Sequence, residues 1–177
     1  SRVGGDAQLT PMKKVAGKLR LDLSQYRELE AFAQFGSELD ADTKATLDRG
    51  ERLVELLNQD ELKPWSVPDQ VAAIYSGTGG YLDRLKTERI GEFHDNLLSR
   101  LHSEEQDLMD KIGEGEWSDE IENQLGDAIA EAIDDFGPDF HEDGTPLEEG
   151  ESDRITSEEE RQKEGRTSGS SDADDSD

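Results

Sequence analysis

The sequence predicts an all-α protein, a helical bundle followed by an acidic, disordered tail. Apolar residues recur at three- and four-residue spacing through most of 11–136, the period of helices with one buried face. No segment alternates apolar and polar residues as a half-buried strand does. After residue 136 the composition changes, because 137–177 holds 15 acidic and four basic side chains and almost nothing apolar. Such a segment buries too little surface to offset the entropy lost on ordering.

The first long helix is predicted to begin at Thr10-Pro11, with the Thr10 hydroxyl as the N-cap and proline in the first turn. Gly36 is expected to end it, and Ser37 or Asp40 to cap a second helix. The residues expected on the buried faces are Leu19, Leu23, Tyr26, Leu29, Phe32 and Ala33 in the first helix, and Leu47, Leu53, Leu56 and Leu57 in the second.

Pro64 and Pro68 indicate a loop and the first turn of a third helix, which should end at the Gly77-Thr78-Gly79-Gly80 run. The apolar spacing over 90–112 predicts one longer amphipathic helix after it.

The final helix is expected to follow a turn at Gly113-Glu114-Gly115. Ser118 stands where an N-cap is required, and the apolar residues from Ile121 to Phe136 share one helix face. Gly137-Pro138 should stop the helix.

The charge and composition exclude several classes of function. The net charge is −26, from 45 acidic and 19 basic residues, which disfavours direct contact with nucleic acid or anionic lipid. No cysteine is present, so disulfides and thiolate metal sites are excluded. No apolar run reaches the ~20 residues that cross a bilayer, so no direct membrane insertion is expected. The acidity itself has two open interpretations, adaptation to high salt or simply an acidic, solvated surface.

Basic residues are concentrated at the start of the chain, where 1–35 holds six against four acidic ones. The same region contains unusually specific words: SRVGGDAQ, VAGKLRLDLSQYRELEAFAQFGSELDA, RGERLVELL and QVAAIYSGTGGYLD. These resemble the C-terminal part of the alpha subunit of the F-type, proton-translocating ATP synthase. The resemblance runs without a gap from Ser1 to about Asp83 and loosely to about Phe136, and 137–177 has no counterpart in it.

The resemblance implies three parts and a function. Residues 1–10 would be the end of an upstream nucleotide-binding domain, 11–136 a helical C-terminal domain, and 137–177 an acidic tail. The domain would pack in the alpha–beta ring of the catalytic headpiece that couples proton flow to ATP synthesis or hydrolysis. Its partners would be the beta subunit and the central-stalk gamma subunit, on the cytoplasmic face of the cell membrane. The chain alone would catalyse nothing and bind no cofactor, since ATP or ADP with Mg belongs to the full complex.

Arg2 is the candidate catalytic residue. The resemblance implies that the arginine of the SRVG word reaches into the catalytic site of the neighbouring beta subunit and contacts the terminal phosphate. A planar, permanently charged guanidinium stabilises the negative charge that phosphoryl transfer spreads over the γ-oxygens. Without the family words, an arginine at this position would be interpreted as a frayed surface residue.

Two further groups are implied by the resemblance. Gln59 and Glu61 match a segment near the adenine of the non-catalytic nucleotide, although Glu61 replaces a glutamine and can only accept hydrogen bonds. Ser37, Glu38 and Asp40 match a turn that faces the rotating stalk. Without the resemblance, the first pair is a polar loop and the second group is ordinary helix capping.

Other motifs fail on inspection. Gly17-Lys18 lacks the rest of a phosphate-binding loop, because Met12 and Leu19 replace the required glycine and hydroxyl residue. A calcium loop over 139–150 lacks its final glutamate, which is Gly150 here. No metal site is therefore predicted. Three histidines show no ligand spacing and are expected on the surface: His94, His102 and His141.

The chief alternative is a free-standing acidic helical module that binds basic protein partners. The net charge permits it. The long specific words over 12–83 favour the ATP synthase interpretation instead. A separate hypothesis, that the acidic tail docks on a basic neighbour and damps ATP hydrolysis, stands beside the simpler one of a solubilising tail.

Overall fold

The computed structural model describes residues 2–35, 39–58 and 64–148, and within them it has helices and no strand. The only β pairing among these residues is an isolated bridge between Phe140 and Pro146. The all-α prediction is confirmed. The elements are α1 (Arg2–Asp6), α2 (Thr10–Ala33), α3 (Ala41–Leu57), α4 (Val67–Thr78), the 3-10 turns η1 (Tyr81–Arg84) and η2 (Thr87–Arg89), α5 (Ile90–Glu104), α6 (Gln106–Gly113) and α7 (Asp119–Phe136).

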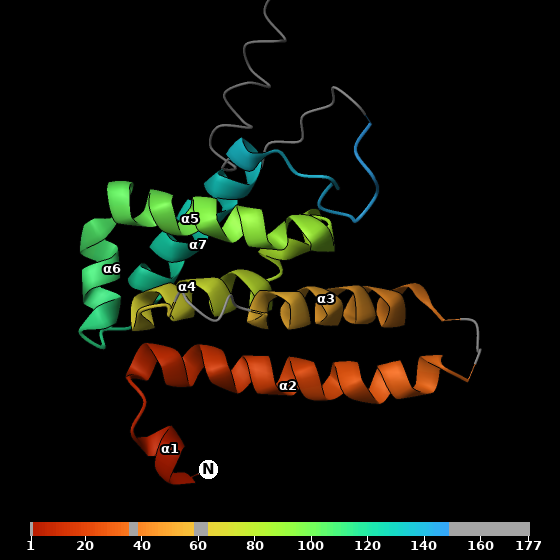
Figure 1. The fold of residues 1–177 in the computed structure, drawn as a ribbon, viewed down its shortest axis with the longest axis horizontal. Helices are drawn as coiled ribbons and strands as arrows, with labels where there is room; N and C mark the ends of the chain where they lie inside the picture. The colour runs from red at the N-terminus through yellow and green to blue at the C-terminus, as the bar shows by residue number, and fades with distance from the viewer. Residues whose placement is uncertain (1, 36–38, 59–63, 149–177) are drawn as a thin grey trace, which may run out of the picture.

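The helices form layers around one core. Helix α2 packs on α3 and α4, which lie between it and α5, while α7 packs on α5 and α6 joins the two halves (Figure 1). Phe93 of α5 is fully buried and belongs to one apolar core cluster. That cluster draws residues from every helix from α2 to α7 and from η1, so the core runs through all the layers.

Helix α2 is long but buried only over its first half. Its buried residues are Pro11, Met12, Val15 and Leu19, whereas Phe32 is 59% exposed and so is not the core residue that was predicted. Thr10 is also not the N-cap, because that position falls on Leu9, whose side chain cannot accept a hydrogen bond. Pro11 stands in the first turn as predicted. Spacing could not show that the far end of α2 extends past the elements that cover its start.

Three side-chain caps fix the starts of other helices. The Asp40 carboxylate accepts from the Thr43 amide at 2.8 Å, which confirms one of the two predicted caps of α3. Ser66 and Asp69 form a reciprocal capping box at α4, and the Ser118 hydroxyl accepts from the Ile121 amide at 3.2 Å at α7. These bonds satisfy amide groups that have no partner within a helix.

The single helix predicted over 90–112 is wrong, because the chain bends at Glu105 and continues as α6. Glu105 leaves the helical conformation, with φ −123° and ψ 35°, although its amide still bonds Leu101. The bend turns α6 onto α4 and α7, where Leu108 and Ile112 become buried. Neither glycine nor proline marks the position, so only packing decides it.

Residues 137–148 are placed against the helices, which departs from the disorder expected for the whole acidic segment. The amides of Asp139 and Phe140 donate to the Arg84 carbonyl at 2.8 and 3.2 Å. The Asp139 carboxylate pairs with Arg89 at 2.9 Å and accepts from the Lys86 amide. Composition predicts disorder from the number of acidic groups, but it cannot predict that Arg84 and Arg89 lie where 137–148 can bind them. Residues 149–177 lie outside the described part of the chain.

Candidate functional site at the amino-terminal helices

Arg2 is the first residue of α1, a five-residue helix joined to α2 by Ala7, Gln8 and Leu9. The structure describes its backbone and not its side chain. Helix α1 stands off the amino-terminal end of α2 (Figure 1), and its Val3 is 81% exposed. Arg2 thus begins a short helix that the rest of the chain barely covers.

The other predicted site residues are mostly outside the described ranges. Ser37 and Glu38 fall in the gap before α3, and Gln59 and Glu61 in the gap after it. In the sequence the two groups flank opposite ends of a 17-residue helix, α3.

Asp40 is the one residue of the predicted stalk-facing turn that the structure describes. Its hydrogen bond with Thr43 lowers the pKa of the carboxyl, so it remains an anion at neutral pH. The end of α2 beside this turn carries two exposed aromatic side chains, Phe32 at 59% and Phe35 at 86%. Sequence reasoning missed this apolar surface, because it assigned Phe32 to the core and made no prediction for Phe35.

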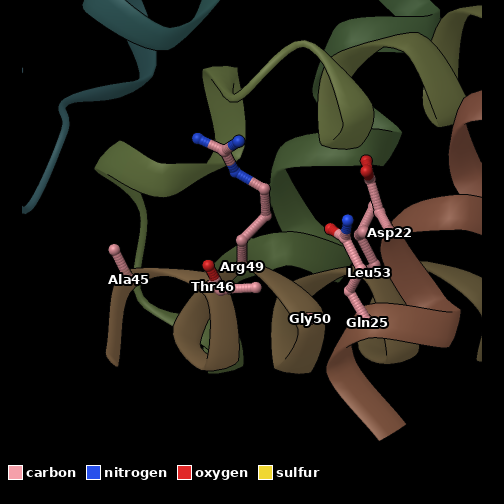
Figure 2. Close-up of a pocket in the computed structure, with 7 residues that line it drawn as sticks. All are labelled: Asp22, Gln25, Ala45, Thr46, Arg49, Gly50 and Leu53. Atoms are coloured by element: carbon pink, nitrogen blue, oxygen red, sulfur yellow. The ribbon is translucent and has the colours of Figure 1, made fainter. Parts of the chain in front are cut away.

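A small groove separates α2 from α3 (Figure 2). Its volume is about 140 Å³. Arg49 from α3 forms a two-atom ion pair with Asp83 of η1, with Nε 3.0 and 3.2 Å from the carboxylate oxygens. Gly50 leaves room for the Tyr26 ring, whose Cδ2 lies 2.1 Å from where a Cβ would stand. The residues lining the groove are Asp22, Gln25, Ala45, Thr46, Arg49, Gly50 and Leu53.

This groove is a joint between helices. The Asp22 Oδ2 atom is buried and has no hydrogen-bond partner among the described residues. Thr46 is already committed, since its hydroxyl donates to the Asp42 carbonyl at 2.9 Å. Asp83 engages Arg49, which raises the pKa of that guanidinium and keeps it charged. The arrangement ties α2, α3 and η1 together.

His94 is buried, which corrects the surface location predicted for it. Its side chain is 2% exposed, and its Nε2 lies 3.2 Å from the Ser76 hydroxyl, which itself donates to the Ala73 carbonyl. The ring also contacts Trp65 edge-on. Burial lowers the pKa of His94 to about 4, so the imidazole is neutral at pH 7. His102 is exposed and pairs with Asp69 at 2.7 Å.

No group of three potential metal ligands occurs within 2–35, 39–58 and 64–148. In the same ranges no helix is long and apolar enough to cross a membrane. Of the site residues expected from sequence, these ranges include only Asp40 and the backbone of Arg2.

The helical body and its hairpin define the class of protein, because residues 8–132 match the family described as the ATP synthase alpha/beta chain, C terminal domain. The chain belongs to this family. The match covers the elements from the start of α2 into the last turn of α7.

Particular relatives agree with the resemblance read from the sequence. The chain is 54% identical over 132 residues to the ATP synthase subunit alpha of Mycolicibacterium vanbaalenii, and 48% identical over 140 residues to those of Mycobacterium bovis and Mycobacterium tuberculosis. These alignments cover 74% and 79% of this chain but 24% and 25% of the relatives. The chain spans about a quarter of their length. The prediction that it resembles the C-terminal region of an alpha subunit is confirmed.

Proposed function

We propose that this chain is the C-terminal helical domain of an ATP synthase alpha subunit, working inside the headpiece that couples proton flow to ATP synthesis and hydrolysis. One observation carries this. The family match at 8–132 takes in nearly all of the helical body, and the relatives that share about half its residues are alpha subunits. The domain would act by packing in the alpha–beta ring, on the cytoplasmic face of the membrane, and would catalyse nothing alone.

Arg2 would supply an arginine finger to the neighbouring beta subunit. Its position supports this, because α1 projects from the body beside exposed Val3 and leaves its surroundings open to a partner. Residues 1–10 would then be the end of the upstream nucleotide-binding domain. A guanidinium meeting the terminal phosphate of ATP with Mg would contribute about three to five decades of rate.

The turn between α2 and α3 would face the central-stalk gamma subunit. Asp40 stays anionic there, and Ser37 and Glu38 precede it. Exposed Phe32 and Phe35 add an apolar surface next to these charges. An apolar centre beside polar groups is what a specific protein interface requires.

Gln59 and Glu61 would lie near the non-catalytic nucleotide of the full subunit. In the sequence they follow α3, whereas the residues assigned to the stalk-facing turn precede it. Nucleotide would be bound only in the full complex, with most contacts made by domains that precede this one.

The test is replacement of Arg2 by lysine and by alanine in the full subunit, assembled with beta and gamma. ATP turnover should fall by about three decades or more for alanine, while nucleotide stays bound. Lysine should rescue poorly, because it lacks the planar fork. The matched control is Arg20→Ala, an exposed arginine of α2 whose Nε bonds only the Ala16 carbonyl of its own helix. Turnover within twofold of wild type for Arg2→Ala would refute the finger.

The rival function is a free-standing acidic module. The proteins that co-purify with the full subunit distinguish the two functions. Tagged protein should bring down a beta subunit in fixed ratio, and that association should survive ~0.5 M salt because apolar contacts resist screening. Capture of assorted basic proteins that is lost in salt would favour the acidic module instead.

A further inference from the structure

A cavity of about 350 Å³ lies beside the first half of α2, away from every site residue named above. It falls within the range of small-molecule sites. It is bounded by α2, the end of α4, η1 and the start of α7. The lining residues are Lys14, Val15, Lys18, Tyr75, Thr78, Gly79, Tyr81, Trp117 and Glu122.

Three aromatic rings form the inner wall. Tyr75 packs against Tyr81 and against Trp117, with ring centroids 6.0 Å apart in both pairs. Rings this close already contact each other, so a guest would stack on the cluster and not enter between its members. Tyr81 is held from behind, because its hydroxyl lies 2.5 Å from where a Cβ of Gly126 would stand. The wall is therefore already formed without a guest.

Gly79 keeps the cavity open at its edge. A Cβ at this position would lie 2.6 Å from the Tyr81 ring and 2.8 Å from the Tyr75 carbonyl. No side chain can stand here without displacing the aromatic wall, so the approach to the rings stays clear.

Two lysines stand at the mouth. Lys14 and Lys18 are four residues apart on α2, so their ammonium groups project from the same helix face. Both side chains are exposed, and among the described residues neither takes part in an ion pair. The lining thus holds two lysines and one carboxylate, Glu122, which acts on the Tyr75 hydroxyl at the aromatic side, so the positive charge lies at the α2 side of the cavity.

We propose that this cavity binds a small aromatic phosphate monoester, with its ring on the tyrosine–tryptophan wall and its phosphate between Lys14 and Lys18. The ring of the ligand matches the aromatic wall, and its phosphate matches the two lysines. Two ammonium groups offset the two charges of a phosphate dianion. The wall offers a π surface for a planar ring, and Gly79 leaves the path between the two halves free. Neither a bare ring nor a bare phosphate would use both.

Trp117 reports directly on the site. The chain has two tryptophans, so Trp65→Phe leaves Trp117 as the sole source of indole fluorescence. Phenyl phosphate should quench it saturably at low millimolar concentration. Methyl phosphate, which has the charge without the ring, and phenol, which has the ring without the charge, should each bind at least about tenfold more weakly. Equal binding of phenyl and methyl phosphate would overturn the proposal, because simple charge attraction would explain both.

Matched variants test the lysines. Lys14→Gln with Lys18→Gln should weaken phenyl phosphate at least about tenfold, whereas Lys13→Gln, exposed on the same helix but outside the cavity, should leave it unchanged. If both sets lose affinity equally, or neither does, the site is refuted. Should Trp65→Phe fail to fold, the indole N–H signals of the unaltered chain in an NMR titration give the same comparison.

Discussion

The amino-terminal hairpin and the carboxyl-terminal half of the bundle use their apolar residues in opposite ways. Helix α2 has 24 residues and buries four of them, whereas α7 has 18 and buries six. Helix α5 hides Phe93 completely, while α2 leaves Phe32 more than half exposed. The difference shows a division of labour. The helices from α4 to α7 supply most of the buried core, whereas the last turn of α2 leaves an apolar surface exposed.

The strongest test of this difference in burial is to truncate one phenylalanine in each region and compare the two losses of stability. Phe93→Ala should lower the free energy of unfolding by about 3–5 kcal/mol, since it empties a fully packed site. Phe32→Ala should change it by less than about 0.5 kcal/mol, because most of that ring already faces water. Urea unfolding followed by circular dichroism measures both. A large loss for Phe32→Ala would mean that the last turn of α2 also belongs to the core.

A pH titration sharpens the same contrast. The folded pKa of His94 is about 4 against 6.5 for the free side chain, so the unfolded state takes up the proton first as pH falls. Stability from the neutral imidazole is present above about pH 6.5 and is lost between there and about pH 4. We expect the free energy of unfolding to be about 2 kcal/mol lower at pH 5 than at pH 7.

His94→Gln should remove that part of the pH dependence, whatever it does to stability at pH 7. His102→Gln is the control, because this histidine is exposed and its ion pair with Asp69 lies near the surface. If the two variants keep identical pH profiles between pH 7 and 5, burial of His94 does not control acid sensitivity.

The smallest expected effect concerns a helix cap in the stable half. Ser118→Ala removes the acceptor for the Ile121 amide and should cost about 1 kcal/mol, seen as a lower urea midpoint. Ser118→Asp, which keeps an acceptor, should restore it. Equal midpoints for alanine and aspartate would show that water replaces the cap without cost.

The functional residues were predicted from stretches of sequence shared with a family, and not from the chemical properties of the residues themselves. Arg2 stands out only through SRVGGDAQ, because neither its spacing nor its local structure distinguishes it from another surface arginine. The aromatic and lysine cavity shows the reverse. Lys14, Tyr75 and Trp117 lie on three separate segments and share no sequence motif, so only folding brings them together.

The sequence by itself determined the helical class, the family and most helix boundaries, because apolar spacing, capping side chains and glycines act through near neighbours in the chain. Asp40, Ser118 and Pro68 stand where those local rules require them. Tertiary packing alone decided the bend at Glu105, the burial of His94 and the docking of 137–148 on Arg84 and Arg89. Each of these depends on residues distant in sequence, whose attraction exists only after the helices have assembled.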